Sequence, residues 1–167
     1  MKSFRQFITE AIDTRSYMRG RCAIFAMALH LEKGYPLGVL WDLNEDGDRD
    51  YMAMGEVDDD AFVQFAKDND DWFPDDQSAV IHVFCYKTPT VLVDAKGCTT
   101  ERGMLQNFNH QPEVDGLDPE FEQTDREEVE EFMKPQSPSN PHGGMLAPKP
   151  GEIDKLRQHI KENPDLY

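Results

Sequence analysis

The sequence lacks the features that mark membrane-spanning, secreted and zinc-binding proteins. No apolar run in its 167 residues approaches the roughly 18 that a membrane span requires. Residues 1–10 contain no continuous apolar segment of the kind found in secretory signals. The three cysteines, Cys22, Cys85 and Cys98, cannot all pair and show no C-x-x-C spacing. We therefore expect a cytoplasmic protein with reduced thiols, no membrane association, no metal and no cofactor.

Basic residues are also scarce. Seventeen lysines and arginines stand against 33 aspartates and glutamates, which gives a formal net charge of -16. An acidic surface repels phosphate backbones, so we expect no direct nucleic-acid binding. The same charge allows a different relation to nucleic acid, in which the surface imitates DNA and occupies a basic protein.

Apolar spacing and turn residues predict an α+β fold. A largely apolar helix over Cys22 to Lys33 is followed by Gly34, a residue typical of helix ends. The spacing also predicts helices over 3–11, 58–69, 100–108 and 151–163 and strands over 37–43, 51–54, 79–86 and 90–95.

Composition divides the chain into four parts. Residues 1–10 form a short amphipathic segment, and residues 11–118 carry the alternating helices and strands of one domain. The sequence predicts an acidic and proline-rich linker over 119–150. A closing helix over 151–167 is then expected to dock on the domain or on a partner.

Cys22 lies where the apolar helix is expected to begin. Unpaired amides and aligned peptide dipoles at a helix N-terminus stabilise a thiolate, which is the reactive form of cysteine. The preceding Gly20 and Arg21 are consistent with a tight entry turn, and the charge of Arg21 would favour the thiolate further if it lies near the sulfur.

His82 and Asp94 are connected by the register of the expected hairpin. If Lys87, Thr88 and Pro89 form a three-residue loop, Tyr86 faces Thr90, Phe84 faces Leu92, and His82 faces Asp94. The two side chains then lie on one sheet face, whereas a two-residue loop would put them on opposite faces. A carboxylate in this place orients an imidazole, which in turn acts as base toward a thiol.

These residues give the chain a resemblance to the papain-like and transglutaminase-like superfamily. The matching segments are Gly20-Arg21-Cys22-Ala23, Ile81-His82-Val83-Phe84 and Leu92-Val93-Asp94-Ala95, in that order. The resemblance implies a central N-terminal helix that carries the cysteine, packed on a small antiparallel sheet, with Cys22, His82 and Asp94 as a catalytic triad. Papain has a glutamine shortly before its cysteine, and no glutamine occurs between Ala11 and Cys22.

Residues 1–10 resemble the capsid-targeting peptides of internal head proteins in large tailed bacteriophages. The segment begins with Met-Lys, and Ile8-Thr9-Glu10 matches the triplet after which the head protease cuts. The resemblance implies a protein packaged in the phage head and delivered into the bacterial host. The alternative is an ordinary amphipathic helix that packs on the core.

An acidic segment offers a weak calcium candidate. Its oxygen-bearing residues alternate as in the first half of a calcium loop: Asp42, Asn44, Asp46, Asp48 and Asp50. Ala53 stands where the loop needs a bidentate glutamate, which favours a solvated turn around Asp46-Gly47.

The leading hypothesis is a thiol hydrolase or acyltransferase that acts on an amide of a protein or peptide substrate, as a protease, deamidase or transglutaminase. The resemblance to phage head proteins makes a host protein the expected target. The alternative is a non-enzymatic acidic phage protein that binds and inhibits a host defence factor as a DNA mimic. A third hypothesis keeps the fold as a binding scaffold without the chemistry.

Overall fold

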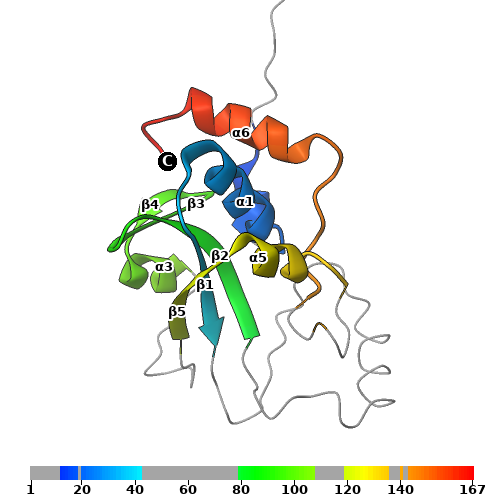
Figure 1. Ribbon diagram of the computed structural model, residues 1–167. Coiled ribbons are helices and arrows are strands. Elements are labelled where there is room, and N and C mark those ends of the chain that lie inside the picture. Colours follow the sequence, from blue (N-terminus) through cyan, green and yellow to red (C-terminus); the bar gives the residue numbers. More distant parts are fainter. Residues whose placement is uncertain (1–11, 19, 43–78, 108–118, 136–139, 141–142) are drawn as a thin grey trace, which may run out of the picture.

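The computed structural model describes residues 12–18, 20–42, 79–107, 119–135, 140 and 143–167, and they form an α+β fold around one antiparallel sheet (Figure 1). The sheet has five strands in the order β4-β3-β2-β1-β5, and each neighbouring pair is antiparallel. The strands are β1 (Leu37–Asp42), β2 (Ala79–Thr88), β3 (Val91–Asp94), β4 (Gly97–Thr99) and β5 (Pro119–Thr124). The helices are η1 (Thr14–Met18), α1 (Cys22–Lys33), α3 (Glu101–Asn107), α5 (Arg126–Phe132) and α6 (Glu152–Glu162).

Two apolar clusters cover the two faces of the sheet. The larger cluster joins α1, α5 and α6 to one face, and its sheet residues include Val39, Val83 and Val93. The smaller cluster joins Met104 of α3 to Leu40, among others, on the other face. Figure 1 shows α1 between the sheet and α6, so the cysteine-bearing helix is enclosed on both sides.

Helix α1 confirms the sequence prediction over 22–33. All residues from Cys22 to Leu29 are buried, as expected for a helix that is apolar on every side. Gly34 ends the helix in the left-handed region with φ of 71°, and its N–H bonds to the carbonyl of His30 at 2.9 Å. A glycine reaches this conformation without the steric cost that a β-carbon adds.

The range 119–150 differs from the predicted linker. Residues 119–124 form β5, which pairs with β1, and residues 126–132 form α5. The acidic side chains of β5 are tolerated because β5 is an edge strand of the described sheet and faces solvent with alternate residues. Val129 and Phe132 pack α5 against the larger cluster. These two apolar residues stand among many charged ones, so the sequence did not predict a packed helix here.

The C-terminal helix α6 docks on the domain. Leu156 and Ile160 are buried in the larger cluster together with residues of α1. The strand β4 over 97–99 was not predicted, because its three residues are too short to show an alternating pattern.

Several sequence predictions lie outside the described residues. They are the targeting segment 1–10, the strand 51–54, the helix 58–69 and most of the calcium candidate. Within the described residues, no helix is long and apolar enough to cross a membrane.

Candidate active site

Cys22 is the first residue of α1, as the sequence predicted. The residue before it, Arg21, is the N-cap and makes no side-chain capping bond to the helix. Ile24 and Phe25 donate their amides to the carbonyl of Arg21, so the intrahelical bonds begin just after the cysteine. The thiol therefore sits at the positive end of the helix dipole, where a thiolate is favoured.

The structure brings Cys22, His82 and Asp94 together. The Nε2 atom of His82 lies 3.1 Å from Oδ2 of Asp94, and the His82 side chain also hydrogen-bonds to Cys22. Asp94 is itself held in place, since its Oδ1 accepts the backbone N–H of Lys96 at 2.7 Å.

The register that joins His82 to Asp94 differs from the predicted one. Cys85 lies opposite Val93 and Tyr86 opposite Leu92, so the pairing is displaced by two residues. Continuing this register puts Asp94 opposite Phe84, and His82 is its diagonal neighbour. Diagonal neighbours are within reach of long side chains, which explains the contact.

A β-bulge keeps His82 and Asp94 on the same face of the sheet. The turn contains only Pro89 and Thr90, and a two-residue loop alone would have separated the two side chains. However, Tyr86 pairs with Leu92 and Thr88 with Val91, so Lys87 is an extra residue that restores the parity. The sequence prediction of a shared face was right, but its loop and its direct pairing were wrong.

The sulfur of Cys22 lies beside the part of β2 that extends beyond the end of β3. The N–H of Tyr86 points toward β1, where it bonds to the carbonyl of Pro36 at 2.8 Å. Because amides alternate along a strand, the N–H of Val83 points to the opposite flank. β3 ends at Asp94, and the sulfur of Cys22 accepts the Val83 N–H there.

The pKa values of Cys22 and His82 move in opposite directions. Burial alone raises the pKa of the Cys22 thiol, but the charge and hydrogen bond of His82 and the amides of Val83 and Ala23 outweigh it, so the pKa falls below 9.0. Burial alone lowers the pKa of His82, but the charge of Cys22, the hydrogen bonds to Asp94 and Cys22, and the charge of Asp94 raise it to about 9. Each group therefore favours the charged form of the other, thiolate at Cys22 and imidazolium at His82.

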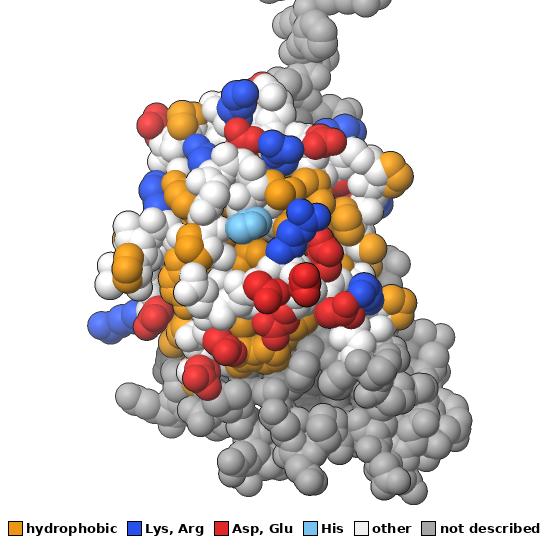
Figure 2. Space-filling model, in the orientation of Figure 1, with side chains coloured by type: hydrophobic (Ala, Val, Ile, Leu, Met, Phe, Trp, Pro, Cys, Tyr) orange, Lys and Arg blue, Asp and Glu red, His pale blue; other side chains and the backbone are white. Residues whose placement is uncertain are grey.

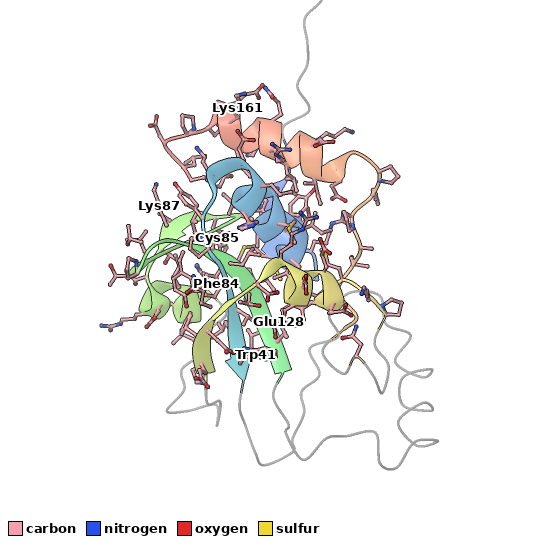
Figure 3. The ribbon with its side chains drawn as sticks, in the orientation of Figure 1. Trp41, Phe84, Cys85, Lys87, Glu128 and Lys161 are labelled. Carbon is pink, nitrogen blue, oxygen red and sulfur yellow. The ribbon has the colours of Figure 1, made fainter. Side chains whose placement is uncertain are left out.

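Cys85 provides a comparison within the same core. It lies on β2 beneath α1, and its thiol donates to the carbonyl of Ala26 at 3.3 Å (Figure 3). Burial raises its pKa well above 9.0, as expected for a structural cysteine. Of two buried cysteines in one core, only Cys22 has a histidine partner that reverses the effect of burial.

The site is enclosed. Cys22 and Asp94 are 2% exposed and His82 is 0% exposed. The low dielectric strengthens the attraction within the trio.

Arg21 does not act as the sequence suggested. Its guanidinium pairs with Glu152 at the start of α6 and lies 5.6 Å from the centre of the Tyr17 ring. The sequence contained no signal for this pairing, because 131 residues separate the partners. The Val83 amide was also missed, since a backbone group carries no residue signature.

The calcium candidate stays a prediction. Asp42 ends β1, and the other four residues lie outside the described part of the chain. Within the residues that the structure describes, no group of three or more His, Cys, Asp and Glu side chains is arranged to hold a metal ion.

Comparison of the chain with protein-family models, with curated proteins and with solved structures found no match.

Proposed function

We propose that the protein is a thiol hydrolase or acyltransferase that acts on an amide, with Cys22 as nucleophile, His82 as acid and base, and Asp94 as the orienting acid. The order and placement of these residues support the resemblance to papain-like and transglutaminase-like enzymes. The observation that carries the proposal is the geometry: the buried thiol at the start of α1 is in hydrogen-bonding contact with His82, whose Nε2 lies 3.1 Å from Oδ2 of Asp94. This contact lowers the pKa of Cys22, whereas burial without a histidine partner raises the pKa of Cys85.

The proposed reaction follows from the ionised pair. The Cys22 thiolate attacks the carbonyl carbon of the amide, and the His82 imidazolium gives its proton to the leaving nitrogen as the C–N bond breaks. A thioester remains on Cys22. Water or an amine then attacks the thioester, neutral His82 takes the proton of this nucleophile, and the sulfur leaves as a thiolate. Asp94 holds the imidazole in position and stabilises its charge throughout.

The backbone supplies candidate donors for the oxyanion of the tetrahedral intermediate. No glutamine occurs between Ala11 and Cys22 to match the one that papain has shortly before its cysteine. The amides of Ala23 and Val83 already converge on the sulfur. Donors so close to the attacking atom are suited to the negative charge that develops next to it.

Selective alkylation tests the proposal. With iodoacetamide at one equivalent and near-neutral pH, we expect Cys22 to react before exposed Cys98 and buried Cys85, and peptide mass spectrometry locates the label. The far-ultraviolet absorbance of the thiolate, compared between the wild type and Cys22→Ser, reports ionisation even if the reagent reaches the sulfur slowly. An ordinary pKa at Cys22 contradicts the enzyme and leaves the binding scaffold.

A charged surface supports the alternative function. Figure 2 shows acidic side chains gathered over β5 and α5. We define the β5–α5 acidic face by its exposed carboxylates: Glu120, Glu122, Asp125, Glu127, Glu128 and Glu131. The two cations of this segment, Arg126 and Lys134, pair with neighbouring glutamates and leave most of the charge unbalanced. Such a face is suited to a basic partner, as in a DNA mimic.

Competition with DNA tests the alternative. A basic DNA-binding protein should be displaced from DNA by this chain at low salt, and less so by a variant with Glu120, Glu127 and Glu131 changed to Gln. Cys22→Ser should displace it as well as the wild type does. No displacement at low salt contradicts the mimic and leaves the enzyme proposal unaffected.

The proposed targets and location follow from the phage resemblance. We propose a host protein as substrate, met in the bacterial cytoplasm after delivery from the phage head. Mass spectrometry of the protein taken from virions tests this proposal, because it measures the N-terminus directly. We expect the chain to be cleaved after Glu10.

A further inference from the structure

We propose that Glu152 is a positioning residue for the nucleophile, so that the C-terminal helix α6 is part of the active site's support. This inference rests on the proposed function of Cys22. Glu152 lies in the first turn of α6, and its side chain is only 11% exposed. It contacts neither the thiol nor a reacting atom, so its effect is transmitted through the turn that precedes Cys22.

Both carboxylate oxygens of Glu152 are committed to that turn or to the start of α6. Oε1 accepts the hydroxyl of Tyr17 at 2.7 Å and pairs with the guanidinium of Arg21. Oε2 accepts the backbone N–H of Lys149 at 2.8 Å, which ties the carboxylate to the segment just before α6. Burial alone raises the pKa of Glu152, but these hydrogen bonds and the charge of Arg21 outweigh it and lower the pKa below 4.5.

The turn held in this way is the direct entry to Cys22. Gly20 has φ of 65°, a conformation that side-chain-bearing residues rarely adopt, and its carbonyl accepts the N–H of Leu146 at 2.9 Å. Arg21 stacks on the Tyr17 ring and forms the N-cap of α1. The segment before α6 and the first turn of α6 thus hold Tyr17, Gly20 and Arg21 from one side.

The consequence for Cys22 follows from where its partners lie. His82 and the Val83 amide belong to β2, whereas Cys22 belongs to α1, so their contact depends on how α1 enters the fold. A displacement of about 1 Å at a reacting group can lower a rate about 100-fold. Loss of the Glu152 contacts should therefore weaken the pairing of Cys22 with His82 and raise the pKa of the thiol.

The direction of the change separates positioning from a simple charge effect. Removing a negative charge and freeing the nearby Arg21 guanidinium would, by electrostatics alone, stabilise the thiolate and lower the pKa of Cys22. A positioning role predicts instead that the pKa of Cys22 rises. A purely structural role predicts a lower melting temperature with no change in the thiol pKa.

The experiment compares Glu152→Gln with Asp154→Asn in the full chain. Both changes remove one carboxylate from the first turn of α6, but Asp154 is 82% exposed and reaches only Arg157, at 3.8 Å. We measure the pH midpoint of Cys22 thiolate absorbance against matched Cys22→Ser backgrounds. We expect Glu152→Gln to raise the midpoint by about one pH unit, a tenfold loss of thiolate below the midpoint, and Asp154→Asn to leave it unchanged.

The other outcomes are decisive too. A lowered or unchanged midpoint in folded Glu152→Gln overturns the positioning role. If that variant does not fold, Tyr17→Phe replaces it, because it removes one donor to Glu152 and keeps the ring under Arg21. A smaller rise supports the proposal, and no rise overturns it. An ordinary midpoint in the wild type instead contradicts the proposed function itself.

Discussion

Replacing Asp94 with Asn is expected to disable the thiolate–imidazolium pair while leaving the fold in place. Asn has the shape of Asp and keeps an oxygen to accept the Lys96 N–H, but it lacks the charge that stabilises the imidazolium. The change therefore isolates the electrostatic contribution of the carboxylate.

The expected magnitude follows from the site. Cys22 and Asp94 together raise the pKa of His82 from 6.5 to about 9 against the effect of burial. That difference corresponds to about 3 kcal/mol in favour of the imidazolium. A hydrogen bond to a charged group contributes about 1.5–3 kcal/mol, so Asp94→Asn should lower the pKa of His82 by roughly one to two pH units.

Nuclear magnetic resonance of the His82 ring measures this change directly, and thiolate absorbance reports the accompanying rise in the pKa of Cys22. Asp154→Asn, which removes an exposed carboxylate, serves as the control for net charge. If His82 titrates at the same pH in Asp94→Asn and in the wild type, the buried carboxylate has no effect on the ring and the prediction is wrong.

Three further predictions concern stability. The raised pKa of folded His82 makes a contribution to the free energy of unfolding that is full below pH 6.5 and is lost as pH rises through about 9. The lowered pKa of folded Cys22 makes a contribution that is lost as pH falls through that lowered pKa. Between 6.5 and 9.0 the two dependences have opposite signs and offset each other, so the difference in urea-unfolding free energy between the wild type and Cys22→Ser/His82→Gln should change across this window by less than the uptake of one proton would give; a full one-proton slope over the whole window contradicts the ion pair. Gly38→Ala should destabilise the sheet by about 1–3 kcal/mol, because its β-carbon would lie 2.6 Å from the Phe84 ring, and an unchanged melting temperature would show that the ring moves aside. Leu156→Ala should cost about 2–5 kcal/mol in urea unfolding, since α6 packs on α1 through this fully buried residue, and a negligible loss would show that α6 is not part of the cooperative unit.

The sequence determined much of the candidate site because local signals coincide there. An apolar run bounded by Gly34 defines a buried helix, and a helix start is a local property, so Cys22 was assigned to it correctly. The face shared by His82 and Asp94 was also predicted, since parity along a strand depends on the chain alone unless a bulge intervenes.

Tertiary structure decided the rest. The turn at Pro89-Thr90 displaces the predicted register by three residues and the Lys87 bulge moves it back by one, so the net displacement is two and His82 and Asp94 stay on one face. The Val83 amide meets the sulfur only because β2 continues past the point where β3 ends at Asp94, and the Glu152 contact crosses 131 residues of chain. A sequence pattern reports what neighbours along the chain can do, whereas these contacts depend on how separate elements pack, which no local pattern encodes.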